Sequence, residues 1–298
     1  MSRRLLAHLA LFGANLIYGI NYTLAKDVMP DFIQPLGFIF LRVSGAILLF
    51  WLCYRLFFYE KVAKSDLFKL ALCGLFGVAI NQMLFFEGLN LTTPINAAVI
   101  MVTNPILVLI IGAFLAAEVI TKRKMLGITL GATGAISLIT YGGAVELNSN
   151  HLWGNIMVLI NAASYGVYLV LVKPLMQKYK PITVISWVFL FGFFLIFPFG
   201  WGQFQAIEWS IMPTGILWKA AFVVVCTTFM AYLLNIYGLK SLNPSTVSTY
   251  IYLQPVLASM VAIFTNSDSL SLIKVGAALV IFSGVYLVSI KPKKKYKG

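Results

Sequence analysis

The sequence carries little charge. Of its 298 residues, 10% are charged and 60% are hydrophobic, whereas a soluble domain carries about 25% charged and about 45–50% apolar residues. So few charged side chains cannot cover a water-facing surface. The composition therefore excludes an ordinary soluble domain and indicates a membrane protein, built from spans of about 20 mainly apolar residues.

Cysteine and histidine are also scarce. The three cysteines lie in or beside apolar runs without the spacing of a disulfide or metal site, and the two histidines, His8 and His151, are far apart. Walker, paired-aspartate and HExxH motifs are absent. The sequence therefore predicts no metal and no cofactor, and it argues against an integral-membrane enzyme such as a lipid-modifying transferase.

Acidic residues number 9 against 22 Lys and Arg, which gives a net charge of +13. In a soluble protein this excess would suggest a nucleic-acid partner. Here the basic residues lie between apolar runs and at the termini, so we expect no nucleic acid and interpret them as topology signals. The basic tail, residues 293–298, fits anchoring near anionic lipid.

Apolar runs predict an all-α integral membrane protein with ten transmembrane helices. They cover roughly residues 5–25, 33–57, 67–88, 94–117, 124–142, 152–173, 182–202, 215–238, 244–266 and 271–290. Counted on alternate sides of these spans, eighteen Lys and Arg lie on one side and three on the other, with Arg42 inside a span. This asymmetry predicts that both termini are cytoplasmic.

An internal repeat relates the two halves. FEGLNLTTPINAAVIMVTNPI (residues 86–106) aligns with IYGLKSLNPSTVSTYIYLQPV (residues 236–256) at an offset of 150, which pairs Pro105 with Pro255. Tyr18-Gly19 and Tyr165-Gly166 align at an offset of 147. Because each unit has five spans, an odd number, the copies insert with opposite orientation, as in secondary transporters. We expect repeats at 1–143 and 151–292.

Each repeat carries a proline near the middle of its fourth span. Pro105 removes the helical partner of the Met101 carbonyl, and Pro255 does the same to Ile251. Such carbonyls must face protein or a watery cavity. Two interpretations stand: a packing kink, or paired hinges (Pro105, Pro255) beside a substrate path.

These motifs resemble the EamA-type transporters of the drug/metabolite transporter (DMT) superfamily. The resemblance rests on the two Tyr-Gly motifs, on Arg42 after Pro35 in span two, and on the GLxxxxPxxxxxxxxxxP pattern in both halves. It implies a ten-helix inverted-repeat carrier of the bacterial inner membrane, which exports amino acids, other metabolites or drugs. The second half departs from this pattern, because no Arg matches Arg42.

Ionisable residues inside spans are functional candidates. Arg42 could pair with Glu87, which could also carry a coupling proton. The alternative is that Arg42 reaches the headgroups and Glu87 is interfacial. The amides and aromatics of the spans suit a small zwitterionic or neutral substrate, although such amides also join helices. The substrate-path candidates are Asn15, Tyr18, Asn21, Arg42, Asn81, Gln82, Glu87, Asn104, Asn161, Tyr165, Tyr168, Asn235 and Gln254.

Glycines of spans five and ten, such as Gly127, Gly134 and Gly284, allow close helix contacts. They fit either a homodimer or internal packing. The partners expected are therefore a small-molecule substrate, the lipid bilayer and, on one interpretation, a second copy. The leading function is an exporter of amino acids or related metabolites; a drug exporter and a passive channel are the alternatives.

Overall fold

The computed structural model describes residues 3–141, 151–264 and 271–290, which form ten helical segments and no strand within these ranges. The unbroken helices are α1 (Arg3–Val28), α2 (Pro35–Phe57), α7 (Lys122–Tyr141), α8 (Leu152–Lys178), α9 (Pro181–Gln205) and α14 (Leu272–Ser289). A short 3-10 turn, η3 (Trp209–Ile211), follows α9.

The other segments are interrupted. The third runs through α3 (Lys64–Gly74), the π-helical η1 (Leu75–Ala79) and α4 (Ile80–Leu91); the fourth through α5 (Pro94–Met101) and α6 (Asn104–Ala116). The eighth runs through α10 (Thr214–Phe222), the π-helical η4 (Val223–Met230) and α11 (Ala231–Ser241). The ninth runs through α12 (Pro244–Thr249), the 3-10 turn η5 (Tyr250–Tyr252) and α13 (Leu253–Phe264).

The ten segments occupy the ranges that the apolar runs predict. Seven of them, within the described residues, are long and apolar enough to cross a bilayer. These are Pro35–Phe57, Lys64–Leu91, Asn96–Ala116, Leu152–Lys178, Pro181–Gln205, Thr214–Ser241 and Leu272–Ser289. The chain is thus an all-helical, multi-pass membrane protein.

Prolines mark the starts of helices, because proline fits the first turn and lacks only a donor that has no helical partner there. Pro35, Pro94, Pro181 and Pro244 open α2, α5, α9 and α12. At α5 the Thr93 side chain also accepts from the Asn96 backbone N–H at 3.1 Å, which caps the helix.

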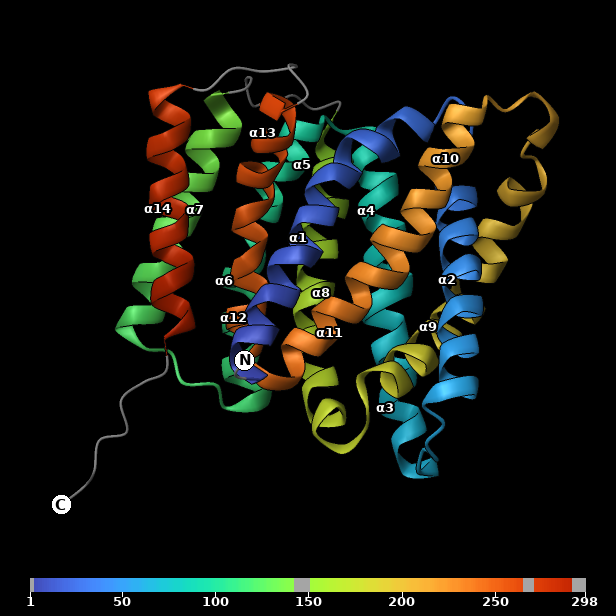
Figure 1. Ribbon diagram of the computed structural model, residues 1–298, viewed down its shortest axis with the longest axis horizontal. Coiled ribbons are helices and arrows are strands. Elements are labelled where there is room, and N and C mark those ends of the chain that lie inside the picture. The colour runs from blue at the N-terminus through green and yellow to red at the C-terminus, as the bar shows by residue number, and fades with distance from the viewer. Residues whose placement is uncertain (1–2, 142–150, 265–270, 291–298) are drawn as a thin grey trace.

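The helices pack in pairs that join the two halves of the chain. In Figure 1, α7 and α14 lie together at one side, while α2 packs with α9 at the other. Between them, α1 packs against α11 and α13, and α8 packs against α4 and α6. Each first-half helix in these central contacts therefore has a second-half partner.

Glycines make the central contacts close, and they do so in matching ways. A Cβ on Gly88 of α4 would lie 2.9 Å from the Gly154 carbonyl oxygen of α8. A Cβ on Gly238 of α11 would lie 3.3 Å from the Ala7 carbonyl oxygen of α1. Gly88 and Gly238 differ by the repeat offset of 150, and Ala7 and Gly154 differ by 147. The same packing thus occurs twice with the halves exchanged.

Two further contacts join residues that are equivalent to each other. Gln82 Nε2 donates to the Tyr232 hydroxyl at 3.1 Å, across a separation of 150 residues. The Tyr252 hydroxyl donates to the Val102 carbonyl at 3.2 Å, across the same separation. Both contacts lie where the two halves of the chain meet.

The small residues of α7 and α14 are used inside the molecule. A Cβ on Gly284 would lie 2.6 Å from Gly127 O and from Gly131 N, and one on Gly134 would lie 3.0 Å from Ala277 O. These glycines therefore bring α7 and α14 close together within the chain. Gly276 differs, because a Cβ there would meet nothing within 4 Å.

Candidate functional site

A cavity that is partly open to solvent lies between the two halves of the chain, and the space between atoms in and around it, the open part included, is about 770 Å³. The first half contributes walls from α1, α2, α4 and α5, and the second half contributes walls from α8, η4, α11, α12, η5 and α13. Its lining residues are Asn15, Tyr18, Asn21, Arg42, Asn81, Gln82, Phe85, Phe86, Met101, Asn161, Tyr165, Thr227, Tyr232, Asn235, Val247, Ile251 and Gln254.

Most of the predicted substrate-path residues meet in this cavity. The fold brings together Asn15, Tyr18, Asn21, Arg42, Asn81, Gln82, Asn161, Tyr165, Asn235 and Gln254. Three candidates do not line it: Glu87, Asn104 and Tyr168. The ring of Tyr168 is 2% exposed and packs against Gly77, where an added Cβ would lie 2.4 Å from a ring carbon.

Asn104 joins helices instead of lining the cavity. Its Nδ2 donates to the Ala162 carbonyl of α8 at 2.8 Å. In the other half, Gln254 Nε2 donates to Asn15 Oδ1 at 2.9 Å. These contacts join equivalent positions, because Asn104 aligns with Gln254 and Asn15 with Ala162. The acceptor is a backbone carbonyl in the first and a side-chain oxygen in the second, and only the second reaches the cavity. Each half therefore has an interhelical amide hydrogen bond at this position, and only the amide of the second half, Gln254, lines the cavity.

Arg42 is the charged residue among the described residues that line the cavity. Its side chain is 3% exposed, so it does not extend to the headgroups. Nε donates to Thr228 Oγ1 at 3.1 Å, and Cζ lies 4.6 Å from the centroid of the Phe86 ring. Nη1 is buried without a hydrogen-bond partner. The guanidinium is thus fixed on one side and unsatisfied on another.

The expected pairing of Arg42 with Glu87 is not observed. Among the described residues, the ion pairs join Lys124 to Glu118, Lys178 to Asp66 and Lys219 to Asp27. Glu87 lies beside Phe86 in sequence and is half-buried outside the cavity wall. The ring of Phe86, and not the neighbouring carboxylate, faces the Arg42 guanidinium.

The amides of the cavity both join helices and leave acceptors unused. Asn161 Nδ2 donates to the Asn81 carbonyl at 2.6 Å, which fixes α8 to α4. The oxygens Asn21 Oδ1, Gln82 Oε1 and Asn161 Oδ1 are buried without a hydrogen-bond partner. Since buried polar atoms are normally satisfied, these oxygens could accept hydrogen bonds from a bound molecule.

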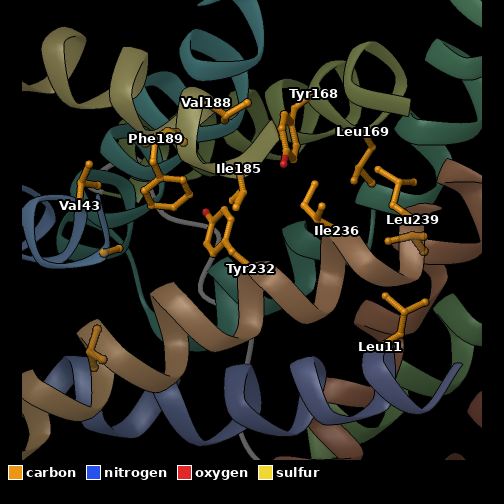
Figure 2. Packing of buried hydrophobic residues seen from close by; sticks show 14 of the residues in the cluster. Leu11, Val43, Tyr168, Leu169, Ile185, Val188, Phe189, Tyr232, Ile236 and Leu239 are labelled. Atoms are coloured by element: carbon orange, nitrogen blue, oxygen red, sulfur yellow. The ribbon is translucent and has the colours of Figure 1, made fainter. Parts of the chain in front are cut away.

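Tyrosines form a second polar group in the cavity. Asn235 Nδ2 donates to the Tyr165 hydroxyl at 2.9 Å. Tyr232 packs edge-on against Phe189 of α9 at a centroid distance of 5.0 Å, and Figure 2 shows both rings beside Ile185. This packing holds the Tyr232 hydroxyl where it can accept from Gln82.

The broken helices also reach the cavity, at positions that the prolines single out. α5 ends at Met101, and Thr103 N bonds to Ile100 O at 2.9 Å in a tighter turn before Pro105. In the other half, Ile251 lies in the 3-10 turn before Pro255. Met101 and Ile251 both line the cavity.

The π-helical segments have no signal in the sequence. A π-turn is often found at functional sites, and η4 carries Thr227, which lines the cavity, and Thr228, which holds Arg42. The Thr228 hydroxyl donates to Val223 O at 2.8 Å. Neither threonine can be recognised as a site residue from the sequence, because its effect depends on this local change of helix geometry.

Known proteins resemble the chain along nearly all of its length. "Uncharacterized transporter YyaM" of Bacillus subtilis is 25% identical over 289 residues, which are 95% of this chain and 93% of the relative. An "Uncharacterized transporter" of Archaeoglobus fulgidus is 23% identical over 286 residues, 95% of this chain and 97% of the relative. A WAT1-related protein of Arabidopsis thaliana is 24% identical and covers 91% of this chain and 79% of the relative.

A solved structure, titled "Crystal structure of protein", has the same fold. Its TM-score is 0.73 at 19% identity, with 96% of this chain and 97% of the other covered. The sequence model of the EamA-like transporter family matches residues 5–140 and again residues 152–290. The chain therefore belongs to the EamA-like transporter family.

Proposed function

We propose that the protein is a secondary transporter that exports amino acids or related small metabolites by alternating access. One observation carries the proposal: a cavity with many polar side chains in its wall lies between the halves and is lined by both of them. A site at the interface of two repeats can be exposed to either side of a membrane when one repeat moves against the other.

The repeats themselves are part of the proposal. We assign residues 1–143 and 151–292 to two five-helix repeats of opposite orientation, so that all ten segments span the membrane. The matching glycine contacts and the bond between the equivalent residues Gln82 and Tyr232 support this assignment. The distribution of Lys and Arg supports cytoplasmic termini, here in a bacterial inner membrane.

Contacts between the helices that carry the cavity residues would open during transport. His8 Nδ1 and the Tyr250 hydroxyl lie 2.7 Å apart and join α1 to η5. Lys173 Nζ donates to the carbonyls of Lys240 and Leu242 at 3.2 and 2.6 Å, which joins α8 to the end of α11. The breaks before Pro105 and Pro255 are where the helices could bend as these contacts separate.

The test is counterflow in liposomes. Purified protein would be reconstituted, and uptake of labelled amino acids would be measured against an internal excess of each unlabelled form. Saturable, transient accumulation of one group is expected, because a carrier exchanges substrate and saturates. Absence of counterflow in folded protein would remove the amino-acid assignment, and the same assay with drugs would then test the alternative exporter.

A passive channel is the second candidate. Flux that rises linearly with concentration and shows no exchange would identify a pore. Two further proposals are tested separately. Glu87 as carrier of a coupling proton is tested by substitution, and a homodimer is tested by the mass of the detergent-solubilised protein.

A further inference from the structure

We propose that Arg42 is the recognition group for a carboxylate of the transported molecule, so that the central cavity takes small organic anions or zwitterions and rejects cations. This inference rests on the proposed transport function and names the substrate class of the same cavity. The observation behind it is that Nη1 of Arg42 is buried and donates no hydrogen bond.

Arg42 has no counter-ion among the described residues around it. The described residues that line the cavity include no carboxylate, and the described ion pairs do not involve Arg42. A cation held away from water is costly unless it is paired. An intramembrane arginine of this kind therefore creates a site in which an anion is bound more favourably than a neutral or cationic molecule.

The contacts of the guanidinium select the shape of the anion. Thr228 Oγ1 occupies the Nε side, and the Phe86 ring covers one face at 4.6 Å. The Nη side is left for the ligand. A planar carboxylate matches the donors of a guanidinium, so one carboxylate is sufficient to satisfy the unused nitrogen.

The rest of the cavity suits the remainder of such a molecule. Asn21 Oδ1, Gln82 Oε1 and Asn161 Oδ1 are unpartnered acceptors that could take N–H donors. Phe85, Met101 and Ile251 supply apolar walls. A cationic drug would meet these walls but would also meet the unpaired charge of Arg42, which disfavours it.

Binding of simple matched probes tests this inference without measuring transport. The thermal stability of the detergent-solubilised protein would be followed while benzoate, benzamide and inorganic phosphate are added separately. Benzoate is expected to raise the Tm in a saturable way and benzamide is not, because only benzoate carries the carboxylate. Equal effects of benzoate and benzamide would overturn the proposal, and a phosphate effect exceeding that of benzoate would overturn the carboxylate assignment.

Two variants separate recognition from folding. Arg42→Gln removes the charge, and benzoate affinity is expected to fall by about tenfold or more, since hydrogen bonds to charged groups are the strong ones. If Arg42→Gln does not fold, Thr228→Val carries the test: it keeps the charge but removes the hydroxyl that orients Nε, so benzoate binding is expected to weaken, by less than in Arg42→Gln. Unchanged benzoate affinity in the folded variant used would contradict the assignment.

The outcome is distinct from that of the counterflow assay. Counterflow without discrimination between benzoate and benzamide would leave the transport proposal standing and remove the role of Arg42. Arg42-dependent benzoate binding without counterflow of amino acids would leave the anion site and remove the amino-acid assignment.

Discussion

Gln82 donates a hydrogen bond to Tyr232, the residue that lies 150 positions later and occupies the equivalent place in the second half of the chain. The bond therefore lies where aligned positions of the two halves come into contact, and both residues line the cavity. It is nevertheless asymmetric, because one partner is an amide donor and the other a hydroxyl. The two aligned halves thus place these two positions together, and the difference between their side chains makes the two sides of the cavity chemically unlike.

Asn104→Ala and Gln254→Ala form a matched pair. Both amides make an equivalent interhelical hydrogen bond, at 2.8 and 2.9 Å, but only Gln254 lines the cavity. Loss of such a bond in a membrane protein costs about 0.6 kcal/mol on average. We therefore expect similar small losses of thermal stability, with a raised KM for counterflow only in Gln254→Ala. Equal KM changes in both variants would contradict the assignment of the cavity.

Gly284→Ala should strongly destabilise the contact of α7 with α14. The new Cβ would lie 2.6 Å from Gly127 O and Gly131 N, so the two backbones would have to move apart. Overpacking of this kind costs about 1–3 kcal/mol, which predicts a Tm several degrees lower. Gly276→Ala in the same helix is the control, since its Cβ meets nothing within 4 Å. If the Tm of Gly284→Ala equals that of the control, the helices α7 and α14 can move apart at little cost and the prediction is wrong.

Pro105→Ala should slow transport more than it weakens binding. Alanine restores the N–H that proline lacks, which favours a continuous helix across the turn between Met101 and Asn104. We expect a lower maximal counterflow rate at an unchanged KM, and the same result for Pro255→Ala. Pro181→Ala, at the first turn of α9, serves as the control and should leave the rate unchanged. An unaltered rate in both hinge variants would favour the packing-kink interpretation.

Glu87→Gln tests the coupling proton. Exchange needs no net proton movement, so counterflow should persist in the variant. If Glu87 carries the proton, accumulation driven by a pH gradient across the liposome membrane should be lost. The half-buried position of Glu87 outside the cavity wall means that its effect would be on coupling and not on substrate affinity. Accumulation that survives in Glu87→Gln would reject this role.

Many of the cavity residues could be predicted from the sequence, because residues that recur at the repeat offset can be recognised by alignment of the two halves. The matching places of Tyr18 and Tyr165 in the repeat predict a shared role, and both line the cavity. The same reasoning predicts Asn104, which does not line it, because rotation about the helix axis decides which way an amide side chain faces. Tyr168 shows the same limit, since its ring fills the space above Gly77.

The sequence by itself determined the helical segments, the duplication and the proline breaks, because apolar length, repeated spacing and the missing N–H of proline are local properties of the chain. Only the tertiary structure decided the partner of Arg42. The sequence suggests Glu87 as the partner of Arg42, yet the guanidinium contacts Thr228 and the Phe86 ring. Thr228 belongs to the π-helical segment η4, which packs against α2, and neither segment encodes this packing by itself.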